Sequence, residues 1–319
     1  TPSDLLDYSK LAEKVGFTSI MASDHFHPWV PSQGQSGYVW SWLGALGATT
    51  GLRFGTGVTP PGPRYHPAII AQAAATLEQM FPGRFWLGLG AGEALNEHIT
   101  GEYWPEPPTR LEKLAEGIEI IQKLFTGKVV KYNGKHFKLE SAKLYTRGEQ
   151  APPIYVATAG PIQSERTGRV CDGIITPGAA DEKIKMLMGR FEKGAREAGK
   201  APATMPRIIQ VHVSWAETLQ EATDNAVKEW PNGGMNFPKG DIRNPEDFEA
   251  MSKLVRPENY KNRVLISPDL EDHIAHLRHF VELGFTEIYV HNVGRNQEAF
   301  IKAFGEKVIP AVTAAAATA

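Results

Sequence analysis

Ionisable and aromatic side chains are concentrated in the stretch Ser23-Asp-His-Phe-His-Pro-Trp29. This stretch directly follows residues 18–22, an apolar run typical of a buried strand. A histidine at a strand end can act as a general base near neutral pH, and Asp24 or another acceptor could fix the tautomer of His25. An isolated histidine is more often a hydrogen-bonded structural residue, but the density of this cluster favours a catalytic role for His25.

The spacing of His25 and His27 also raises the question of a metal site. Two such ligands would need further histidine, cysteine or carboxylate groups, and Glu97 and His98 are the nearest candidates. These residues match no zinc-binding spacing. We therefore expect no metal ion.

A second candidate region is Gly88-Leu-Gly-Ala-Gly-Glu-Ala-Leu-Asn96, which overlaps and follows a predicted strand at 84–89. Its glycines do not form the dinucleotide-binding pattern Gly-x-Gly-x-x-Gly, because the third position falls on Glu93 or Leu95. They suit a close approach of the backbone to a flat ring system, with Glu93 placed to exchange a proton. The alternative is a tight turn in which Glu93 is an ordinary carboxylate at the start of a helix.

Both candidate regions belong to a regular alternation of short apolar runs and longer amphipathic ones. The predicted strands are 18–22, 52–58, 84–89, 153–157, 171–175, 207–215 and 286–291, and the predicted helices are 5–15, 40–49, 67–80, 110–125, 162–169, 183–199, 270–283 and 297–304. Such alternation predicts a parallel sheet. We expect a (β/α)₈ barrel rather than an open doubly wound sheet, as one domain over residues 1–319, with a first strand that would precede Thr1. Barrel active sites form at the C-terminal ends of strands, where both candidates fall.

Two segments interrupt this alternation. In residues 127–148, Asn133-Gly134 is a signal for a type I′ hairpin turn. Residues 216–263 are rich in Pro, Gly and Asn and are expected to form an elaborated loop near a site. Arg64, Lys239 and Arg263 are each, taken alone, more typical of solvated charges, although Arg263 precedes a short apolar run at 264–266 and could be partly sheltered.

The composition excludes several classes of partner. With 34 Lys and Arg against 36 Asp and Glu, the net charge is −2, so no global attraction to nucleic acid or to an anionic membrane is expected. Cys171 is the single cysteine and cannot form an internal disulfide, which fits a reducing cytoplasm. We find no apolar stretch long enough to span a bilayer and no signal peptide. We expect a cytoplasmic homodimer with a small-molecule substrate.

Three motifs together carry a resemblance to a known family. They are Ser-Asp-His-Phe-His-Pro-Trp, Gly-Thr-Gly-Val followed by Pro-Arg-Tyr-His-Pro-Ala-Ile-Ile-Ala-Gln, and Leu-Gly-Ala-Gly-Glu-Ala-Leu-Asn-Glu. The chain resembles the luciferase-like flavin and deazaflavin oxidoreductases, which are TIM barrels, and more narrowly the F420-dependent glucose-6-phosphate dehydrogenases. The resemblance extends from the first helix to Val293 and implies coenzyme F420, an 8-hydroxy-5-deazaflavin, as the cofactor.

The resemblance also implies roles for individual residues. His25 would take the proton of the sugar hydroxyl, Glu93 would protonate the deazaflavin ring, and Trp29 would shape the face for hydride transfer. Gly57-Val58 would be a cis peptide behind the deazaflavin. Lys239, Arg263 and Thr176 would bind the sugar phosphate. The other implied coenzyme contacts are Asp24, Ala91, Gly92, Asn96, Ala159, Gly160, Ile162 and Gln163.

The chain departs from the family pattern in two places. The family has a further lysine after the strand that ends at Ile175, but here the segment is Thr176-Pro-Gly-Ala-Ala180, with no lysine before Lys183. A threonine that contacts the coenzyme in the family aligns with Pro60, although Thr59 is adjacent. The coenzyme site is therefore better supported than the phosphate site.

The leading hypothesis is an F420-dependent enzyme that moves hydride from C1 of a sugar 6-phosphate, such as glucose 6-phosphate, to the deazaflavin and gives the lactone. The alternatives are an F420-dependent dehydrogenase or reductase of an unphosphorylated alcohol or ketone, and an FMN-dependent luciferase-like monooxygenase. A barrel without catalytic activity is a further alternative, which the presence of both His25 and Glu93 disfavours.

Overall fold

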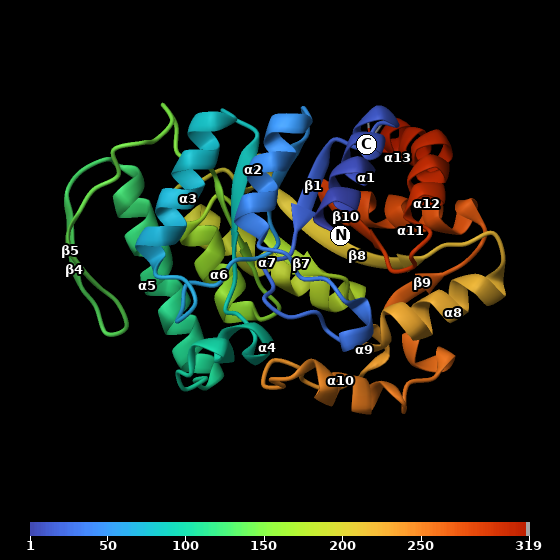
Figure 1. The fold of residues 1–319 in the computed structure, drawn as a ribbon. Coiled ribbons are helices and arrows are strands. Elements are labelled where there is room, and N and C mark those ends of the chain that lie inside the picture. The colour runs from blue at the N-terminus through green and yellow to red at the C-terminus, as the bar shows by residue number, and fades with distance from the viewer. Residues whose placement is uncertain (317–319) are drawn as a thin grey trace.

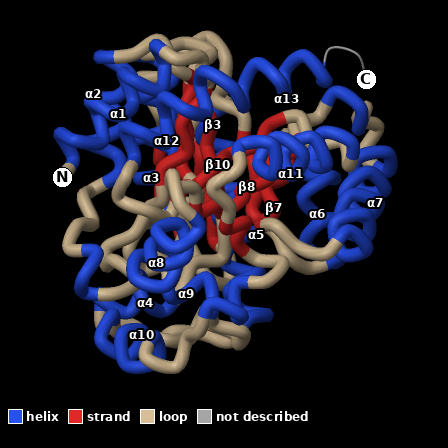
Figure 2. The backbone as a smooth tube through the Cα atoms, turned by 90° about the vertical axis from the view of Figure 1, so that its right-hand side faces the viewer, coloured by secondary structure: helices blue, strands red, loops and turns tan. Residues whose placement is uncertain are grey.

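The structure, a computed structural model, describes residues 1–316. Its centre is a parallel sheet surrounded by helices (Figures 1 and 2). The strands of this sheet are β1 (Ser19–Ala22), β2 (Arg53–Thr56), β3 (Phe85–Leu89), β6 (Ile154–Ala157), β7 (Gly173–Pro177), β8 (Arg207–Ser214), β9 (Val264–Ile266) and β10 (Glu287–Asn292). They pair in the order β1-β2-β3-β6-β7-β8-β10, and β9 pairs with the C-terminal end of β8. The predicted α/β barrel is confirmed.

The predicted helices also form, and their ends lie within three residues of the expected positions. The helices are α1 (Pro2–Lys14), α2 (Val39–Thr49), α3 (Pro67–Met80), α4 (Ala94–Glu97), α5 (Pro107–Phe125), α6 (Pro161–Val170), α7 (Asp181–Glu197), α8 (Leu219–Glu229), α9 (Pro231–Gly234), α10 (Pro245–Ser252), α11 (Leu270–Glu282), α12 (Gln297–Ala303) and α13 (Ile309–Ala316). No helix within residues 1–316 has the length and hydropathy needed to cross a bilayer.

The start of α3 illustrates how local sequence sets these boundaries. Pro67 occupies the first turn, where its missing N–H costs nothing, and the His66 side chain accepts a hydrogen bond from the Ala68 N–H. The face that carries Ile70 and Ala74 is buried against the sheet layer. Strand β3 is buried along its whole length, as expected for a strand covered on both faces.

The barrel interior is filled by large side chains. Trp86 on β3 is fully buried and packs on Tyr155 of the neighbouring strand β6, with ring centroids 5.3 Å apart. A Cβ atom at Gly55 on β2 would lie 2.1 Å from the Trp86 indole, so only glycine leaves room for that ring. The core of the barrel therefore depends on a small residue opposite a large one.

The two ends of the strand order, β1 and β10, are linked by side chains. The hydroxyl groups of Ser19 and Tyr289 are 2.6 Å apart, and Arg53 on β2 donates to Glu287 at 3.0 Å. A cavity of about 990 Å³ lies along β1 and β10 and reaches the loop after β1. Its wall includes His25 and Trp29, two of the candidate catalytic residues, but not Glu93.

The two segments predicted to interrupt the alternation lie in different parts of the fold. Residues 127–148 contain the antiparallel hairpin of β4 (Val130–Asn133) and β5 (Lys138–Ala142), whose loop rests on Glu116 of α5. The hairpin prediction is correct, but the type I′ turn is wrong. Asn133 pairs with Lys138, which leaves a four-residue loop, and neither Asn133 nor Gly134 has the positive φ that this turn requires. Residues 216–263 instead form α8, α9 and α10 beside α4, at one end of the barrel (Figures 1 and 2).

Candidate functional site

His25 and Glu93 face each other across the ends of two barrel strands. His25 lies in the loop after β1, and Glu93 is the residue that precedes α4 in the turn after β3. The distance between His25 Nε2 and Glu93 Oε2 is 3.8 Å, and their side chains expose 22% and 35% of their surface. The structure thus brings the two candidate catalytic groups together in a partly sheltered position.

Burial shifts the acidities of these two groups in opposite directions. It lowers the pKa of His25 to about 4, aided by the nearby positive charge of Arg64. It raises the pKa of Glu93 to about 7, against an opposing effect of Lys239. At neutral pH, His25 is therefore a free base, and a substantial fraction of Glu93 carries a proton.

Trp29 forms an aromatic wall beside His25. Its ring centroid is 5.3 Å from that of His25. On the other side it packs edge-on against Phe248 of α10 at 5.2 Å and Trp230 at 6.3 Å. The main-chain N–H of Trp29 donates to Gln33. Residues from the 216–263 segment thus fix the orientation of Trp29.

Arg64 is a buried member of the site and not a solvated charge, which corrects the sequence-based interpretation. Its side chain is 8% exposed and donates to the Asp24 carboxylate at 2.9 Å and to the Asp24 carbonyl at 2.7 Å. Thr59 donates to the other Asp24 oxygen at 2.6 Å, and Tyr65 lies 3.3 Å from the first. Since these groups occupy both carboxylate oxygens, Asp24 supports the loop of His25 through Arg64.

The same guanidinium connects the two candidate regions. Arg64 Nε donates to Glu97 of α4 at 3.0 Å, and α4 follows Glu93 directly. From the same helix, Asn96 Oδ1 accepts hydrogen bonds from the main-chain N–H groups of Phe26 and His27, at 2.9 and 3.2 Å. These bonds tie α4 to the loop after β1, which sets the relative position of His25 and Glu93.

The histidines considered for a metal site make other contacts. The imidazoles of His27 and His98 stack with centroids 5.5 Å apart. Their Nδ1 atoms lie 2.8 and 2.7 Å from the carbonyl oxygens of Leu95 and Ala94. Both rings therefore hold α4 and its surroundings in place.

The predicted coenzyme contacts gather where β2, β3 and β6 end. The Gly57-Val58 peptide is cis. Gly92 has φ +78, a conformation that side chains disfavour. Ala91 and Gly92 follow β3, while Ala159 and Gly160 follow the adjacent strand β6. A Cβ atom at Gly160 would meet no other atom within 4 Å, so there is open space at this position.

The neighbouring contacts differ in accessibility. Ile162 in the first turn of α6 is 82% exposed, whereas Gln163 is 8% exposed. Helix α6 has no side-chain hydrogen bond at its N-cap, Gly160. Thr59 is fully buried, and its hydroxyl is already donated to Asp24. Thr59 therefore supports Asp24, and its predicted contact with the coenzyme stays a prediction.

The three residues predicted to bind phosphate differ in their burial and in their hydrogen-bond partners. Lys239 and Arg263 both donate to the carbonyl oxygen of Met235, at 3.2 and 2.9 Å. Burial and the nearby Arg263 lower the pKa of Lys239, whereas Glu93 raises it. Arg263 is exposed, contrary to the expectation of partial shelter. Thr176 is fully buried at the end of β7, and its hydroxyl has no hydrogen-bond partner in residues 1–316.

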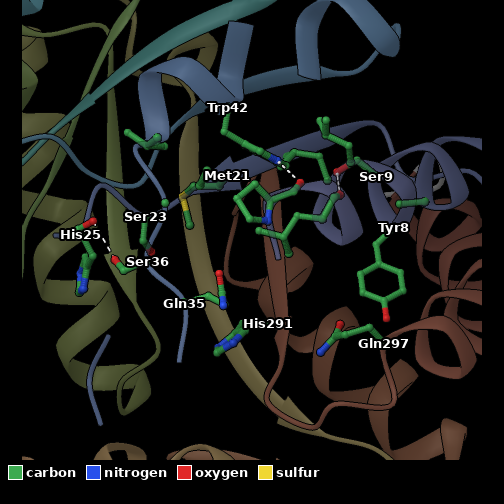
Figure 3. Close-up of a pocket in the computed structure, with 18 of the residues that line it drawn as sticks. Tyr8, Ser9, Met21, Ser23, His25, Gln35, Ser36, Trp42, His291 and Gln297 are labelled. Carbon is green, nitrogen blue, oxygen red and sulfur yellow. Dashed lines mark hydrogen bonds between the residues drawn. The ribbon is translucent and has the colours of Figure 1, made fainter. Parts of the chain in front are cut away.

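The cavity described above reaches the loop of His25 and Trp29 but not the three predicted phosphate residues. His25, Trp29, Trp230 and His291 all contribute to its wall, and Figure 3 shows His25 and His291 among its lining residues. Sequence reasoning misjudged Arg64 as a solvated charge and missed Trp230 and Phe248. A counter-charge for Asp24 and Glu97 could have been anticipated, since both follow strands, but no local signal marks Trp230 or Phe248.

Comparisons with known proteins agree with this arrangement. Residues 1–287 match the family described as luciferase-like monooxygenase. The chain is 36% identical to an F420-dependent glucose-6-phosphate dehydrogenase of Microbacterium testaceum, over 97% of this chain and 93% of that protein. It is 33% identical to the protein of the same name from Nakamurella multipartita, over 98% and 93%.

Solved structures resemble the fold over its whole length. An F420-dependent secondary alcohol dehydrogenase, in complex with an F420-acetone adduct, has a TM-score of 0.91 and 35% identity, covering 98% of this chain and 95% of that one. The coenzyme F420-dependent tetrahydromethanopterin reductase of Methanopyrus kandleri has a TM-score of 0.79 at 22% identity, over 97% and 95%, a likeness of fold alone.

Proposed function

Because the chain belongs to the luciferase-like family, and within it to the F420-dependent glucose-6-phosphate dehydrogenases, we propose that it oxidises C1 of a sugar 6-phosphate with coenzyme F420. Glucose 6-phosphate is the proposed substrate and the lactone the product. The observation that carries this proposal is the pairing of a neutral histidine with a protonatable glutamate, His25 and Glu93, 3.8 Å apart at the end of the barrel.

The residues around this pair suit a flat deazaflavin ring. Ala91, Gly92, Ala159 and Gly160 carry no bulky side chain, and the space beside Gly160 is open. The start of α6, which no side chain caps, suits an anionic tail of the coenzyme, because the N-terminus of a helix favours negative charge. When bound, the coenzyme supplies a carbon that accepts hydride. We propose that Asp24 and Asn96 hold this end of the site, and that Ile162 and Gln163 line the tail.

The proposed reaction needs one proton removed and one delivered. His25 takes the proton of the C1 hydroxyl while the hydride leaves C1 and the carbonyl of the lactone forms. Glu93 would hold the proton needed by the ring that accepts the hydride, so that charge would not accumulate on either partner. Trp29 packs beside His25 and would limit the space next to this base.

For the phosphate, we propose Lys239 and Arg263 as the binding cations. They share the carbonyl of Met235, so their charges lie close together. Arginine can bind phosphate with two parallel hydrogen bonds, while lysine supplies a compact charge. We also propose a role for Thr176, whose hydroxyl lacks a partner among the described residues.

A second candidate function is the oxidation of an unphosphorylated secondary alcohol. Lys239 already donates to two main-chain carbonyls, of Asn232 and Met235, and residues 176–180 contain no lysine. The structural neighbour at 35% identity is a secondary alcohol dehydrogenase. These observations favour weaker phosphate binding than a pocket with more cations would give.

We further propose that residues 1–319 form a single barrel domain with insertions at 127–148 and 216–263, and that the protein acts as a homodimer in the cytoplasm. The single cysteine, Cys171, is buried, which fits a reducing compartment. The partner is a small molecule, and the net charge of −2 offers no general attraction to nucleic acid.

Anaerobic absorbance titration tests the proposal directly. The purified protein is titrated with F420 and, separately, with FMN, and the F420 complex then receives glucose 6-phosphate, free glucose or a simple secondary alcohol. We expect tighter binding of F420 than of FMN and bleaching of F420 by glucose 6-phosphate. Tighter binding of FMN would support the monooxygenase alternative, and bleaching by the alcohol alone would support the second candidate.

A further inference from the structure

Two histidines outside the proposed catalytic pair face the barrel interior. His212 on β8 and His291 on β10 are direct cross-strand neighbours, and their Nδ1 atoms are 2.9 Å apart. Both side chains are partly accessible. His291 lines the cavity that also contains His25 (Figure 3). His291 is therefore within reach of a molecule that enters this cavity, and His212 is its direct neighbour.

The contact between the two Nδ1 atoms determines which hydrogen-bonding groups remain. One Nδ1 must carry the hydrogen and the other must accept it. Burial lowers the pKa of His212 to about 3 and that of His291 to about 4, with further contributions from His291 and Lys239 to the shift of His212. Both rings are then neutral, so one Nε2 is an acceptor and the other a donor. The ring centroids are 5.1 Å apart, so the two Nδ1 atoms point at each other and the two Nε2 atoms point in opposite directions. The Nε2 of His291 is therefore the atom that this ring offers to a ligand.

An aromatic wall connects this pair to the catalytic residues. The Trp230 ring lies 4.6 Å from His291 and 5.1 Å from His212, and it contacts Trp29, which in turn contacts His25. The indole Nε1 of Trp230 lies against Gly233, where a Cβ atom would be only 2.7 Å away. The imidazole of His291 therefore supplies the hydrogen-bonding group for a ligand at this end of the wall.

We propose that the Nε2 atom of His291 binds a hydroxyl group of a polyhydroxylated substrate, with His212 fixing the orientation of the His291 ring, and so favours a sugar phosphate over a simple secondary alcohol. A hydroxyl can both donate and accept, so it matches the Nε2 of His291 in either tautomer. Lys239, proposed above for the phosphate, lies close enough to influence His212. A simple alcohol has one hydroxyl, which His25 engages, and it leaves the Nε2 of His291 without a partner. This inference rests on the proposed function.

The test combines substrate analogues with variants of one histidine. KM and kcat are measured with F420 for glucose 6-phosphate, for its 2-, 3- and 4-deoxy analogues, and for 2-propanol. In the wild type, we expect one deoxy analogue to have a higher KM than glucose 6-phosphate, by about 3- to 10-fold for a lost hydrogen bond. His291→Phe should raise the KM of glucose 6-phosphate by a similar factor. In this variant, glucose 6-phosphate and that deoxy analogue should have the same KM.

Two further variants separate recognition from folding. His291→Asn keeps a polar group at the position and should lie between the wild type and His291→Phe. His276→Asn is the matched control, because His276 is a half-buried histidine on α11 that packs on Phe280 and is not part of the cavity wall. It should leave every KM unchanged. The KM for 2-propanol should change little in all three variants.

Several outcomes would overturn the inference. An equal rise in KM for 2-propanol and glucose 6-phosphate in His291→Phe would mean that the histidines only shape the pocket. Equal KM values for all deoxy analogues in the wild type would contradict the inference but not the proposed function, whereas oxidation of alcohols alone would overturn both.

Independently, ¹⁵N NMR of histidine-labelled protein should show one ring of the pair protonated at Nδ1, and protonation of both rings at Nε2 would contradict the hydrogen-bond pattern.

Discussion

Two regions of the molecule meet at the candidate site and are held by different kinds of interaction. The loops after β1 and β3 carry His25 and Glu93 and are joined by the buried guanidinium of Arg64. The segment 216–263 carries Lys239 and ends at the exposed Arg263. These two cations are held by main-chain carbonyls and, for Arg263, also by the side-chain oxygen of Asn236, and not by carboxylates.

Because of this difference, we expect the first region to serve proton transfer and the second to serve substrate binding. Buried ion pairs with several hydrogen bonds hold groups within narrow limits, because any displacement leaves a charge without a partner. Proton transfer needs such limits. A cation near the surface can adjust to a phosphate and contributes to binding without setting the geometry of the reacting atoms. We therefore expect substitutions in the first region to affect turnover or stability, and those in the second to affect KM.

The largest effect is expected from His25→Ala. Loss of the general base should lower kcat by about 10²–10⁴, while the affinity for F420, measured by absorbance titration, changes little. The exposed neighbour Phe26 gives a control, and Phe26→Ala should keep most of the activity. A His25→Ala enzyme that retained most of its kcat would remove His25 from the mechanism.

Arg64→Met should cause the next largest change, in stability. It leaves Asp24 and Glu97, each with a side chain about 1% exposed, without their shared cation, and breaking a buried pair costs about 3–5 kcal/mol. Denaturant unfolding measures this change. Arg53→Met provides a comparison, because Arg53 is 42% exposed and its pair with Glu287 should contribute about 0–1 kcal/mol. Equal losses in both variants would contradict the role of the buried network.

In the second region, Lys239→Ala and Arg263→Ala should raise the KM for glucose 6-phosphate. Loss of one charge-assisted hydrogen bond corresponds to about 10- to 150-fold, with a smaller fall in kcat, since the phosphate is remote from the reacting carbon. Lys261→Ala, which removes an exposed charge close by in the chain, should leave KM unchanged. The sugar-phosphate assignment fails if neither truncation alters KM.

The smallest effect concerns pH. Glu93 must be protonated to act as an acid, and its pKa is raised to about 7, so kcat should fall by about 10-fold as the pH rises from 6 to 8. His25, with a pKa lowered to about 4, stays neutral throughout this range and adds no slope. The Glu93→Gln enzyme should have a lower kcat, and its kcat should no longer fall as the pH rises through 7. An unchanged profile would make Glu93 a helix-start carboxylate only.

Much of the fold could be predicted because it depends on local patterns. The alternation of apolar and amphipathic runs predicted the strands and the surrounding helices, and Pro67 marked the start of α3 to the residue. The positions of His25 and Glu93 after β1 and β3 followed from the rule that strand ends meet at one end of a barrel. His25 and Glu93 lie close together because of the barrel topology, and the order of strands and helices along the chain already predicts that topology.

The tertiary structure alone decided which charges are buried and which side chains are paired. Arg64 has nothing in its immediate sequence that distinguishes it from a solvated arginine, and it becomes buried because Asp24 and Glu97 approach it from other segments. Likewise, His212 and His291 are separated by 79 positions and pair only through the register of β8 and β10. Burial and partner choice depend on contacts between distant segments, so local patterns in the chain do not record them.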